Sequence, residues 1–177
     1  MEIGEKIAKT ANSFVGQEEI KGNLGFKDEQ FQEMMKAVGW KRKQAWCAYF
    51  CELVWKLAYV HHLGINKQLS ELFSGSTVQT WKNFSASGEW IVDKSPSRGA
   101  VAIWQKYKDG VAHWSGHAGI VIEVKDNKFF SVEGNTNDQG GREGYIVAKK
   151  GRLYRFETDS GLRLLGFIHP KENKLDA

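Results

Sequence analysis

Cys47 is the first residue whose type and position could do chemistry. It stands in the run WCAYF, just after the polar run KRKQ at 41–44, where a predicted helix begins. Free backbone N–H groups and the helix dipole at that end favour a thiolate over a thiol, and the thiolate is the nucleophile in cysteine catalysis. The alternative is that Cys47 is a small residue packed in the core, a common fate of a cysteine in a helix.

A histidine and an acidic residue later in the chain could complete such a site. His117 opens a predicted strand in SGHAGIVI, where the neighbouring glycines leave room for a substrate. In the next predicted strand, FSVEGN, alternation places Ser131, Glu133 and Asn135 on one face. An acid or amide there could accept the ring N–H of His117 and fix its tautomer and orientation. The alternatives are an ordinary surface histidine and a solvent-facing strand edge.

His117 and Glu133 can meet only if both side chains lie on the same face of the sheet. A regular two-residue turn at positions 126–127 would turn Glu133 to the opposite face, because a slip of one residue exchanges the two faces of a strand. We therefore predict a three-residue loop over 126–128, which places Glu133 opposite Val121, or a bulge of equivalent effect.

The elements that must position these residues follow from the apolar pattern. Apolar residues recur at helical spacing in the first half of the chain and with a period of two after Trp90. Helices are predicted over about 2–19, 27–38, 45–62 and 77–84, and strands over 100–104, 117–124, 129–134, 145–149 and 162–169. The helix over 45–62 is apolar on nearly every face, which is typical of a buried helix. Helices followed by strands predict an α+β fold with an antiparallel sheet.

Length and composition favour one folded unit. The chain has 177 residues, of which 41% are hydrophobic, too many for intrinsic disorder. We expect a single domain over 1–177 and a monomer, with a helical part over about 1–85 and a sheet part over about 90–170. The net charge of +4 and the short basic cluster at 41–43 come with no nucleic-acid motif, so we expect no nucleic-acid partner.

Membrane and export signals are also missing from the pattern. No apolar run approaches the ~20 residues of a membrane span. The first residues lack the apolar core of a secretory signal peptide. We therefore expect no membrane partner, and synthesis in the cytoplasm without a signal peptide.

The two cysteines and five histidines do not predict a metal site. Cys47 and Cys51 stand four residues apart, so a disulfide between them would close a trivial loop, and we interpret Cys51 as a core residue. No paired C-x-x-C occurs, and the N-terminal half contains no Asp-x-Asp loop of a calcium site. We expect no metal and no other cofactor.

Taken in order, the motifs WCAYF, RGAVAIW, GHAGIVIE and VEGN resemble the CHAP family, the cysteine- and histidine-dependent amidohydrolases and peptidases. They are also similar to the broader NlpC-type and papain-like group. The resemblance covers about residues 5–170. It implies a papain-like fold, with the nucleophile at the start of a buried helix packed on the sheet. It also implies that Cys47 is the nucleophile, His117 the general base, Glu133 the residue that orients the histidine, and Asn135 the polar residue that completes the site.

The resemblance adds one weaker role and contains one departure. Papain-like enzymes place a glutamine shortly before the nucleophile, so Gln44 could help to form an oxyanion hole, although its spacing here is not the papain one. Many members have Gly-Asp before the strand where this chain has Arg98-Gly99-Ala100, at a position that looks structural. Independently of the family, Trp114 lies just before His117 and could stack on a sugar or stem peptide, with packing at the rim as the alternative.

The function that the resemblance implies is cleavage of an amide bond in peptidoglycan through a thioester, by an amidase or endopeptidase. Such an enzyme could be a lysin or an exported antibacterial toxin, and it would act in the cell wall or periplasm after export or lysis. An exported toxin would require an immunity protein as a partner. The alternatives are a papain-like cysteine protease or transferase acting on a protein, and a non-catalytic wall-binding module. The intact set of Cys47, His117 and Glu133 speaks against the last of these.

Overall fold

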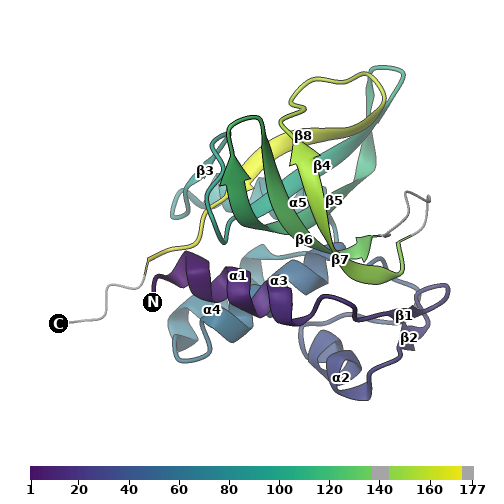
Figure 1. Cartoon of the computed structure of the whole chain (residues 1–177), viewed down its shortest axis with the longest axis vertical. Coiled ribbons are helices and arrows are strands. Elements are labelled where there is room, and N and C mark those ends of the chain that lie inside the picture. The colour runs from purple at the N-terminus through teal and green to yellow at the C-terminus, as the bar shows by residue number, and fades with distance from the viewer. Residues whose placement is uncertain (137–143, 173–177) are drawn as a thin grey trace.

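The protein is a layer of helices packed beneath an antiparallel sheet (Figure 1). The structure is a computed structural model, and it describes residues 1–136 and 144–172. Helices dominate the first half of the chain and strands the second. The α+β class predicted from this order is confirmed.

The helices are shorter and more numerous than the apolar pattern predicts. Within the described residues they are α1 (Ile3–Ser13), α2 (Glu29–Ala37), α3 (Cys47–Ala58), α4 (Leu63–Leu72) and α5 (Thr77–Ser87). The single helix predicted over 45–62 is wrong in its last turn, and α4 was not predicted. Gly64 lies in the first turn of α4. Glycine is tolerated there because the N–H groups of a first turn have no partner within the helix.

Over residues 1–136 and 144–172 the main sheet has six strands, and all of its neighbouring pairs are antiparallel. The strands of this sheet are β3 (Val92–Asp93), β4 (Val101–Lys108), β5 (Val111–Lys125), β6 (Lys128–Thr136), β7 (Ile146–Leu153) and β8 (Gly161–Ile168), in the spatial order β3-β8-β4-β5-β6-β7. A separate two-stranded sheet pairs β1 (Glu19–Ile20) with β2 (Gly25–Phe26). The strand predicted over 117–124 begins earlier, at Val111, and therefore includes Trp114.

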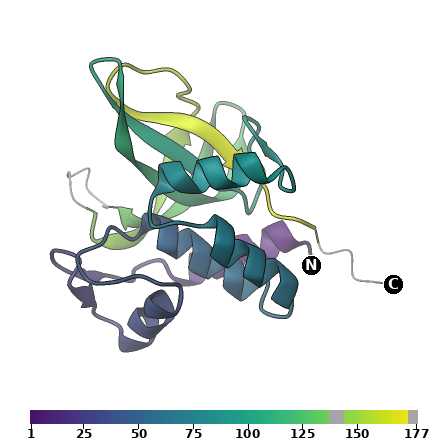
Figure 2. The same ribbon diagram turned by 180° about the vertical axis from the view of Figure 1, so that it is seen from behind.

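The two faces of the main sheet are buried in different ways. One face packs on the helices through side chains such as Ile103, Ile120 and Val132, which join the larger core cluster. Figure 2 shows α5, the teal helix, lying across this face. The other face carries Trp104 and Phe129, which pack in a second cluster within the curled sheet. The sheet is therefore apolar on both sides.

The helix α3 lies at the centre of the larger cluster, as its apolar composition predicts. Trp46, Phe50, Cys51 and Trp55 are all fully buried. The indole of Trp46 packs edge-on against the ring of Phe26, with centroids 5.0 Å apart. Trp46 also packs edge-on against Phe31, so these rings hold the residue before Cys47 and fix the start of α3.

The hairpin between β5 and β6 contains the bulge that the shared face requires. Lys125 pairs with Lys128, so the turn has two residues and the three-residue loop is wrong. Further along, the register shifts and leaves Ile122 as an extra residue on β5. The alternative prediction, a bulge of equivalent effect, is confirmed. Beyond it Ile120 pairs with Val132, and continuing this register places Glu133 across from Gly119, on the face of His117.

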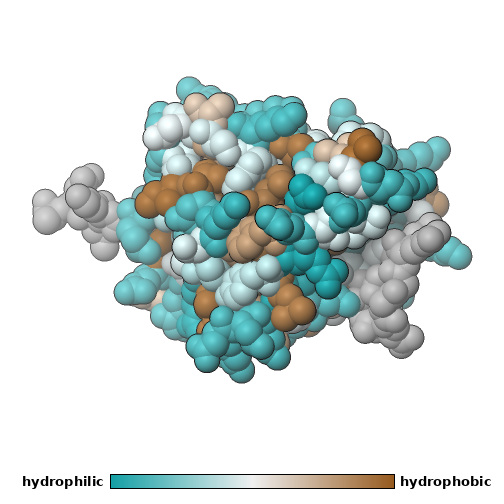
Figure 3. Space-filling model, turned by 90° about the horizontal axis from the view of Figure 1, so that it is seen from above, coloured by the Kyte–Doolittle hydropathy of each residue, from teal (hydrophilic) through white to brown (hydrophobic). Residues whose placement is uncertain are grey.

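The surface that is visible in Figure 3 is mixed. Apolar patches, drawn in brown, lie between hydrophilic residues, and no single patch covers this face. Among the described residues, no helix is both long enough and apolar enough to cross a membrane.

Two glycines in first turns of helices provide a test of the packing of α1 on the loop before β4. A Cβ on Gly4 would lie 2.4 Å from the carbonyl oxygen of Arg98, whereas a Cβ on Gly64 would meet nothing within 4 Å. We expect Gly4→Ala to lower the free energy of unfolding by about 1–3 kcal/mol, because the backbone must move apart. Gly64→Ala should raise it by up to about 1 kcal/mol, because alanine favours a helix. Chemical denaturation measures both, and equal effects would contradict the close approach at Gly4.

Candidate active site

Cys47 is the first residue of α3 and is 5% exposed. It lines a cavity of about 520 Å³ together with His117 and Asn135. The side chain of the preceding residue, Trp46, does not cap the helix, whereas the carboxylate of Asp28 caps α2 by accepting the backbone N–H of Phe31. Among the described residues, the N–H groups of the first turn of α3 therefore have no capping side chain, and they favour negative charge on the sulfur or on a bound oxygen.

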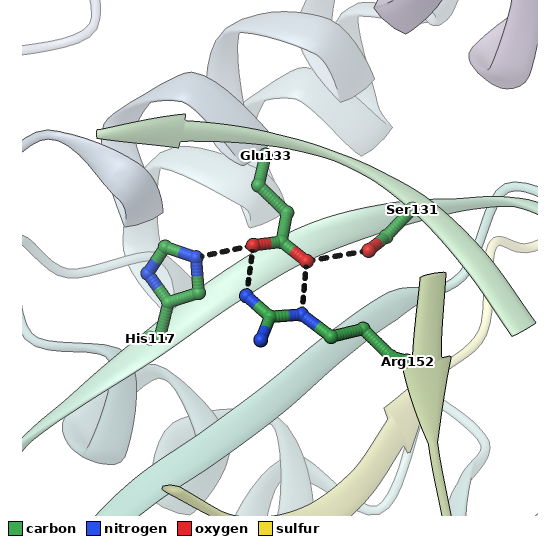
Figure 4. Close-up of polar contacts among 4 residues, drawn as sticks. All are labelled: His117, Ser131, Glu133 and Arg152. Carbon is green, nitrogen blue, oxygen red and sulfur yellow. Dashed lines mark hydrogen bonds and ion pairs between the residues drawn. The ribbon is translucent and has the colours of Figure 1, made fainter. Parts of the chain in front are cut away.

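His117 lies on β5, is hydrogen-bonded to Glu133 and lines the same cavity as Cys47. Its Nε2 lies 2.7 Å from Oε2 of Glu133 (Figure 4). With Nε2 engaged, Nδ1 is the ring nitrogen left to exchange a proton with a thiol. The structure thus brings together the three residues predicted from separate motifs, with the imidazole hydrogen-bonded to the carboxylate and sharing a cavity with the thiol. A base placed between a nucleophile and an orienting acid is the arrangement of nucleophilic catalysis.

Glu133 has no exposed surface, and each of its oxygens accepts two hydrogen bonds. Ser131 donates to Oε1 at 2.6 Å, and Arg152 donates from Nε to Oε1 at 2.8 Å. Oε2 accepts from the second nitrogen of Arg152 as well as from His117. Figure 4 shows the carboxylate held between the imidazole and the guanidinium. A carboxylate without water needs this complete set of donors to stay ionised.

Arg152 is the member of this site that the sequence analysis missed. It lies on β7, and its guanidinium also stacks on the ring of Trp104 at 5.2 Å. Trp104 pairs with His117 across β4 and β5, with ring centroids 5.8 Å apart. A buried glutamate signals that a cation must lie nearby. The segment 149–155 contains several cations, however, and the chain between β6 and β7 does not by its length define which one faces Glu133.

The glycines around His117 serve packing as well as access. A Cβ on Gly119 would lie 2.6 Å from Cγ of Glu133, so the missing side chain is the space that the glutamate occupies. Gly116 lines the cavity, and a Cβ there would lie 2.0 Å from the carbonyl oxygen of Trp104. The space at Gly119, which was expected to admit a substrate, is therefore occupied by the side chain of Glu133, the partner of His117.

The charges of the site reinforce one another. Burial lowers the pKa of His117, but the charge of Glu133 and hydrogen bonds with Cys47 and Glu133 outweigh it and raise that pKa to about 9. Burial raises the pKa of Glu133, but the hydrogen bond from Arg152 and the charge of His117 bring it down to about 2. The site therefore holds an imidazolium and a carboxylate at neutral pH.

The remaining predicted site residues lie in different places. Asn135 lines the cavity in a left-handed conformation, with φ of 51°, just beyond Glu133 on β6. Gln44 does not line the cavity; its amide oxygen accepts from the hydroxyl of Tyr49 at 3.1 Å. Trp114 is 78% exposed and also lies outside that cavity. The structure thus brings Asn135 to the site, while Gln44 and Trp114 lie apart from it.

Among the described residues, neither Cys51 nor a cluster of metal-binding side chains offers an alternative active site. Cys51 is fully buried, and burial, with the nearby charges of Cys47 and Glu133, raises the pKa of its thiol. The thiolate form is thus disfavoured there. In the part of the chain that the structure describes, no three side chains of the metal-binding types gather into a site.

Comparison with known proteins gave a match to a family model. The family model described as CHAP domain matches residues 38–135, a span that includes Cys47, His117, Glu133 and Asn135. Arg152 lies beyond the matched span. No curated protein matches the chain.

Removing the guanidinium tests how the carboxylate is held. We expect Arg152→Gln to raise the pKa of His117 above about 9, because Glu133 then places a less compensated charge beside the ring. The free energy of unfolding should fall by roughly 3 kcal/mol, because a buried carboxylate loses its cation. NMR titration of the imidazole and chemical denaturation measure the two effects.

Arg163 offers the matched control for this variant. It lies on β8, stacks on the ring of Tyr107 at 3.6 Å and donates to the carbonyl of Thr158, away from the site. Arg163→Gln should leave the pKa of His117 unchanged. An unchanged titration in Arg152→Gln would show that Arg152 stabilises the fold without tuning the histidine.

Proposed function

The chain belongs to the CHAP domain family, and we propose that it cleaves an amide bond of peptidoglycan with Cys47 as the nucleophile. Membership makes it an amidase- or peptidase-type hydrolase, a class that usually acts on peptidoglycan. The observation that carries the proposal for Cys47 is that its side chain and His117 line one cavity, while Nε2 of His117 is held by Glu133.

The first half of the proposed reaction forms a thioester. The thiolate of Cys47 attacks the carbonyl carbon of the scissile amide, and the carbonyl oxygen takes up the negative charge. Backbone N–H groups at the uncapped start of α3 are the donors closest in the chain to the nucleophile, and they support the assignment of an oxyanion site there. The C–N bond then breaks as the His117 imidazolium gives its proton to the leaving amine.

The second half releases the acyl group. His117, now neutral, takes a proton from water while the water oxygen attacks the thioester carbon. The C–S bond breaks, the carboxylic acid leaves, and Cys47 returns to the thiolate beside a protonated His117. Glu133 keeps the imidazole oriented through both halves, since its carboxylate is held by Arg152 and Ser131.

A second candidate uses the same residues on a different substrate. A papain-like cysteine protease or transferase acting on a protein would need the same thiol, imidazole and carboxylate. The peptidoglycan reaction is favoured because the family match covers the catalytic motifs themselves. A hydrolase of this kind would act in the cell wall or periplasm, reached by export or after lysis.

Isolated sacculi separate these functions. We expect the wild-type protein to release soluble fragments, and mass spectrometry of the new termini to identify the bond that is cut. Cys47→Ala should lower the rate by at least ~10³-fold while the protein stays folded, because the nucleophile is gone and a smaller side chain fits the space. Cleavage of protein substrates without release from sacculi would favour the protease instead.

Cys51 provides the control for the nucleophile, one turn further along α3. Cys51→Ser should keep its activity on sacculi. Its free energy of unfolding should fall by about 1–3 kcal/mol, because a hydroxyl is buried where a thiol was. An essential Cys51 with a dispensable Cys47 would overturn the assignment of the nucleophile.

The pH dependence of the rate follows from the two shifted groups. The rate should fall as the pH rises through about 9, because His117 then loses the proton that the leaving amine needs. Glu133, with its pKa near 2, stays ionised over the working range and therefore adds no limb to the profile there. Fragment release measured from pH 5 to 10 tests this, and a rate that already falls near the ordinary histidine value of 6.5 would contradict it.

The same shifts give the pH dependence of stability. The pKa of His117 is raised on folding, so its contribution to stability is complete below 6.5 and is lost as the pH rises through about 9. The pKa of Glu133 is lowered on folding, so its contribution is complete above 4.5 and is lost as the pH falls towards 2.

A further inference from the structure

A second buried carboxylate lines the same cavity as Cys47. Glu19, the first residue of β1, is only 7% exposed, and it forms part of the cavity wall together with Asn23. The family match begins at residue 38, so it does not include this segment. The proposed mechanism leaves Glu19 without a role.

The contacts of Glu19 supply two hydrogen bonds to its carboxylate, but neither comes from a positively charged group. Oε2 accepts the indole N–H of Trp46 at 2.6 Å, which ties β1 to the residue before the nucleophile. Oε1 accepts the backbone N–H of Asn23 over a long 3.4 Å. Both donors are neutral. Among the ion pairs between described residues, none involves Glu19.

The other buried glutamates of the described chain show what is missing. Glu133 has Arg152 and His117 beside it, and Glu52 has Lys56 at 2.7 Å. A buried carboxylate is costly unless a cation or a full set of donors compensates it. A carboxylate offers about four acceptor positions, and Glu19 uses two of them.

The neighbouring wall adds a second acceptor. Oδ1 of Asn23 is buried and has no hydrogen-bond partner in the described part of the chain. Lys106 also lines the cavity, but it is exposed and forms no ion pair with Glu19. Among the described residues, this end of the cavity is therefore rich in acceptors, and no cation is paired with Glu19 there.

We propose that Glu19 binds a primary ammonium group of the substrate and so places the scissile amide against Cys47. Such a group occurs on the side chain of a diamino acid and at the free amino end of a peptide. The inference rests on the proposed function for the identity of the substrate, because peptide stems of the wall would carry the amine. Binding replaces the missing cation at Glu19, and the carboxylate gains the charge-assisted hydrogen bond that its other contacts do not supply.

Glu19→Gln removes the charge and keeps the shape and an acceptor for Trp46. On untreated sacculi we expect it to lower kcat/KM by roughly 10- to 100-fold, the range for a lost hydrogen bond to a charged group. Sacculi whose amines have been acetylated should be poor substrates for the wild type by a similar factor. On them Glu19→Gln should cause no further loss. An equal loss on both substrates would mean that Glu19 acts only through Trp46, and would overturn the proposal.

A second measurement does not depend on peptidoglycan. Cys47 can be alkylated by neutral iodoacetamide or by cationic 2-bromoethylamine, and the ratio of the two rates cancels any change in the thiol itself. Glu19→Gln should lower the ratio of cationic to neutral reagent several-fold, because an unpaired carboxylate attracts the ammonium. If the wild type released no fragments from sacculi but Glu19→Gln still lowered the ratio of alkylation rates, peptidoglycan would be rejected as the substrate and the ammonium site would stand. An unchanged ratio would reject the site.

Glu52 is the matched control. It is buried to a similar degree, 5% exposed, but its cation is present and it does not line the cavity. Glu52→Gln should leave the ratio of alkylation rates and the preference for free amines as in the wild type. Loss of the preference in this variant would show that it reflects general damage to α3, and would overturn the assignment to Glu19.

Discussion

The ionised carboxylate of Glu133, buried without any exposed surface, is the interaction on which the rest of the site depends. Each of its oxygens accepts from Arg152, and the remaining positions go to Ser131 and His117. Because no water reaches it, the carboxylate can keep its charge only while these donors stay in place. That charge in turn holds His117 protonated and oriented next to Cys47. A single buried anion thus couples the stability of the sheet to the chemistry at the start of α3.

Three features of the sheet position this carboxylate and shield it from water. The bulge at Ile122 turns Glu133 to the face of His117, and Gly119 leaves the space that the glutamate fills. Trp104 packs beside both the imidazole and the guanidinium of Arg152, which excludes water from the charged groups. Electrostatic interactions are stronger in such an enclosed site than at the surface. The apolar packing therefore strengthens the interactions among the charged groups that it encloses.

The two glutamates that adjoin the catalytic residues differ in what compensates them. Glu133 is compensated from within the fold, so it can orient but has no capacity left for a ligand. Glu19 receives only neutral donors from the described residues, and it lines the cavity. A carboxylate paired with a cation of the protein, such as Glu133, is suited to holding another side chain in position. A carboxylate without such a cation, such as Glu19, is suited to binding a charged group of a substrate.

Patterns within single elements could be predicted from the sequence. The periods of the apolar residues determined the α+β class, and the polar run before WCAYF placed Cys47 near the start of an apolar helix. The motifs around His117 and Glu133 determined the family and the need for a common face. Boundaries were weaker, because α3 ends at Ala58 within the run LAYV at 57–60, which contains no glycine or proline to mark the end of a helix.

Contacts between elements were decided only by the tertiary structure. A bulge at Ile122 in place of a longer loop, the pairing of Arg152 with Glu133, and the approach of Glu19 to the cavity have no local signal. The apolar period reports which side of an element is buried, and it is silent about the register between strands that are joined by a long connection. Charges pair across space according to that register. The sequence by itself therefore determined the catalytic residue types and the elements that carry them, while packing decided which buried charge meets which partner.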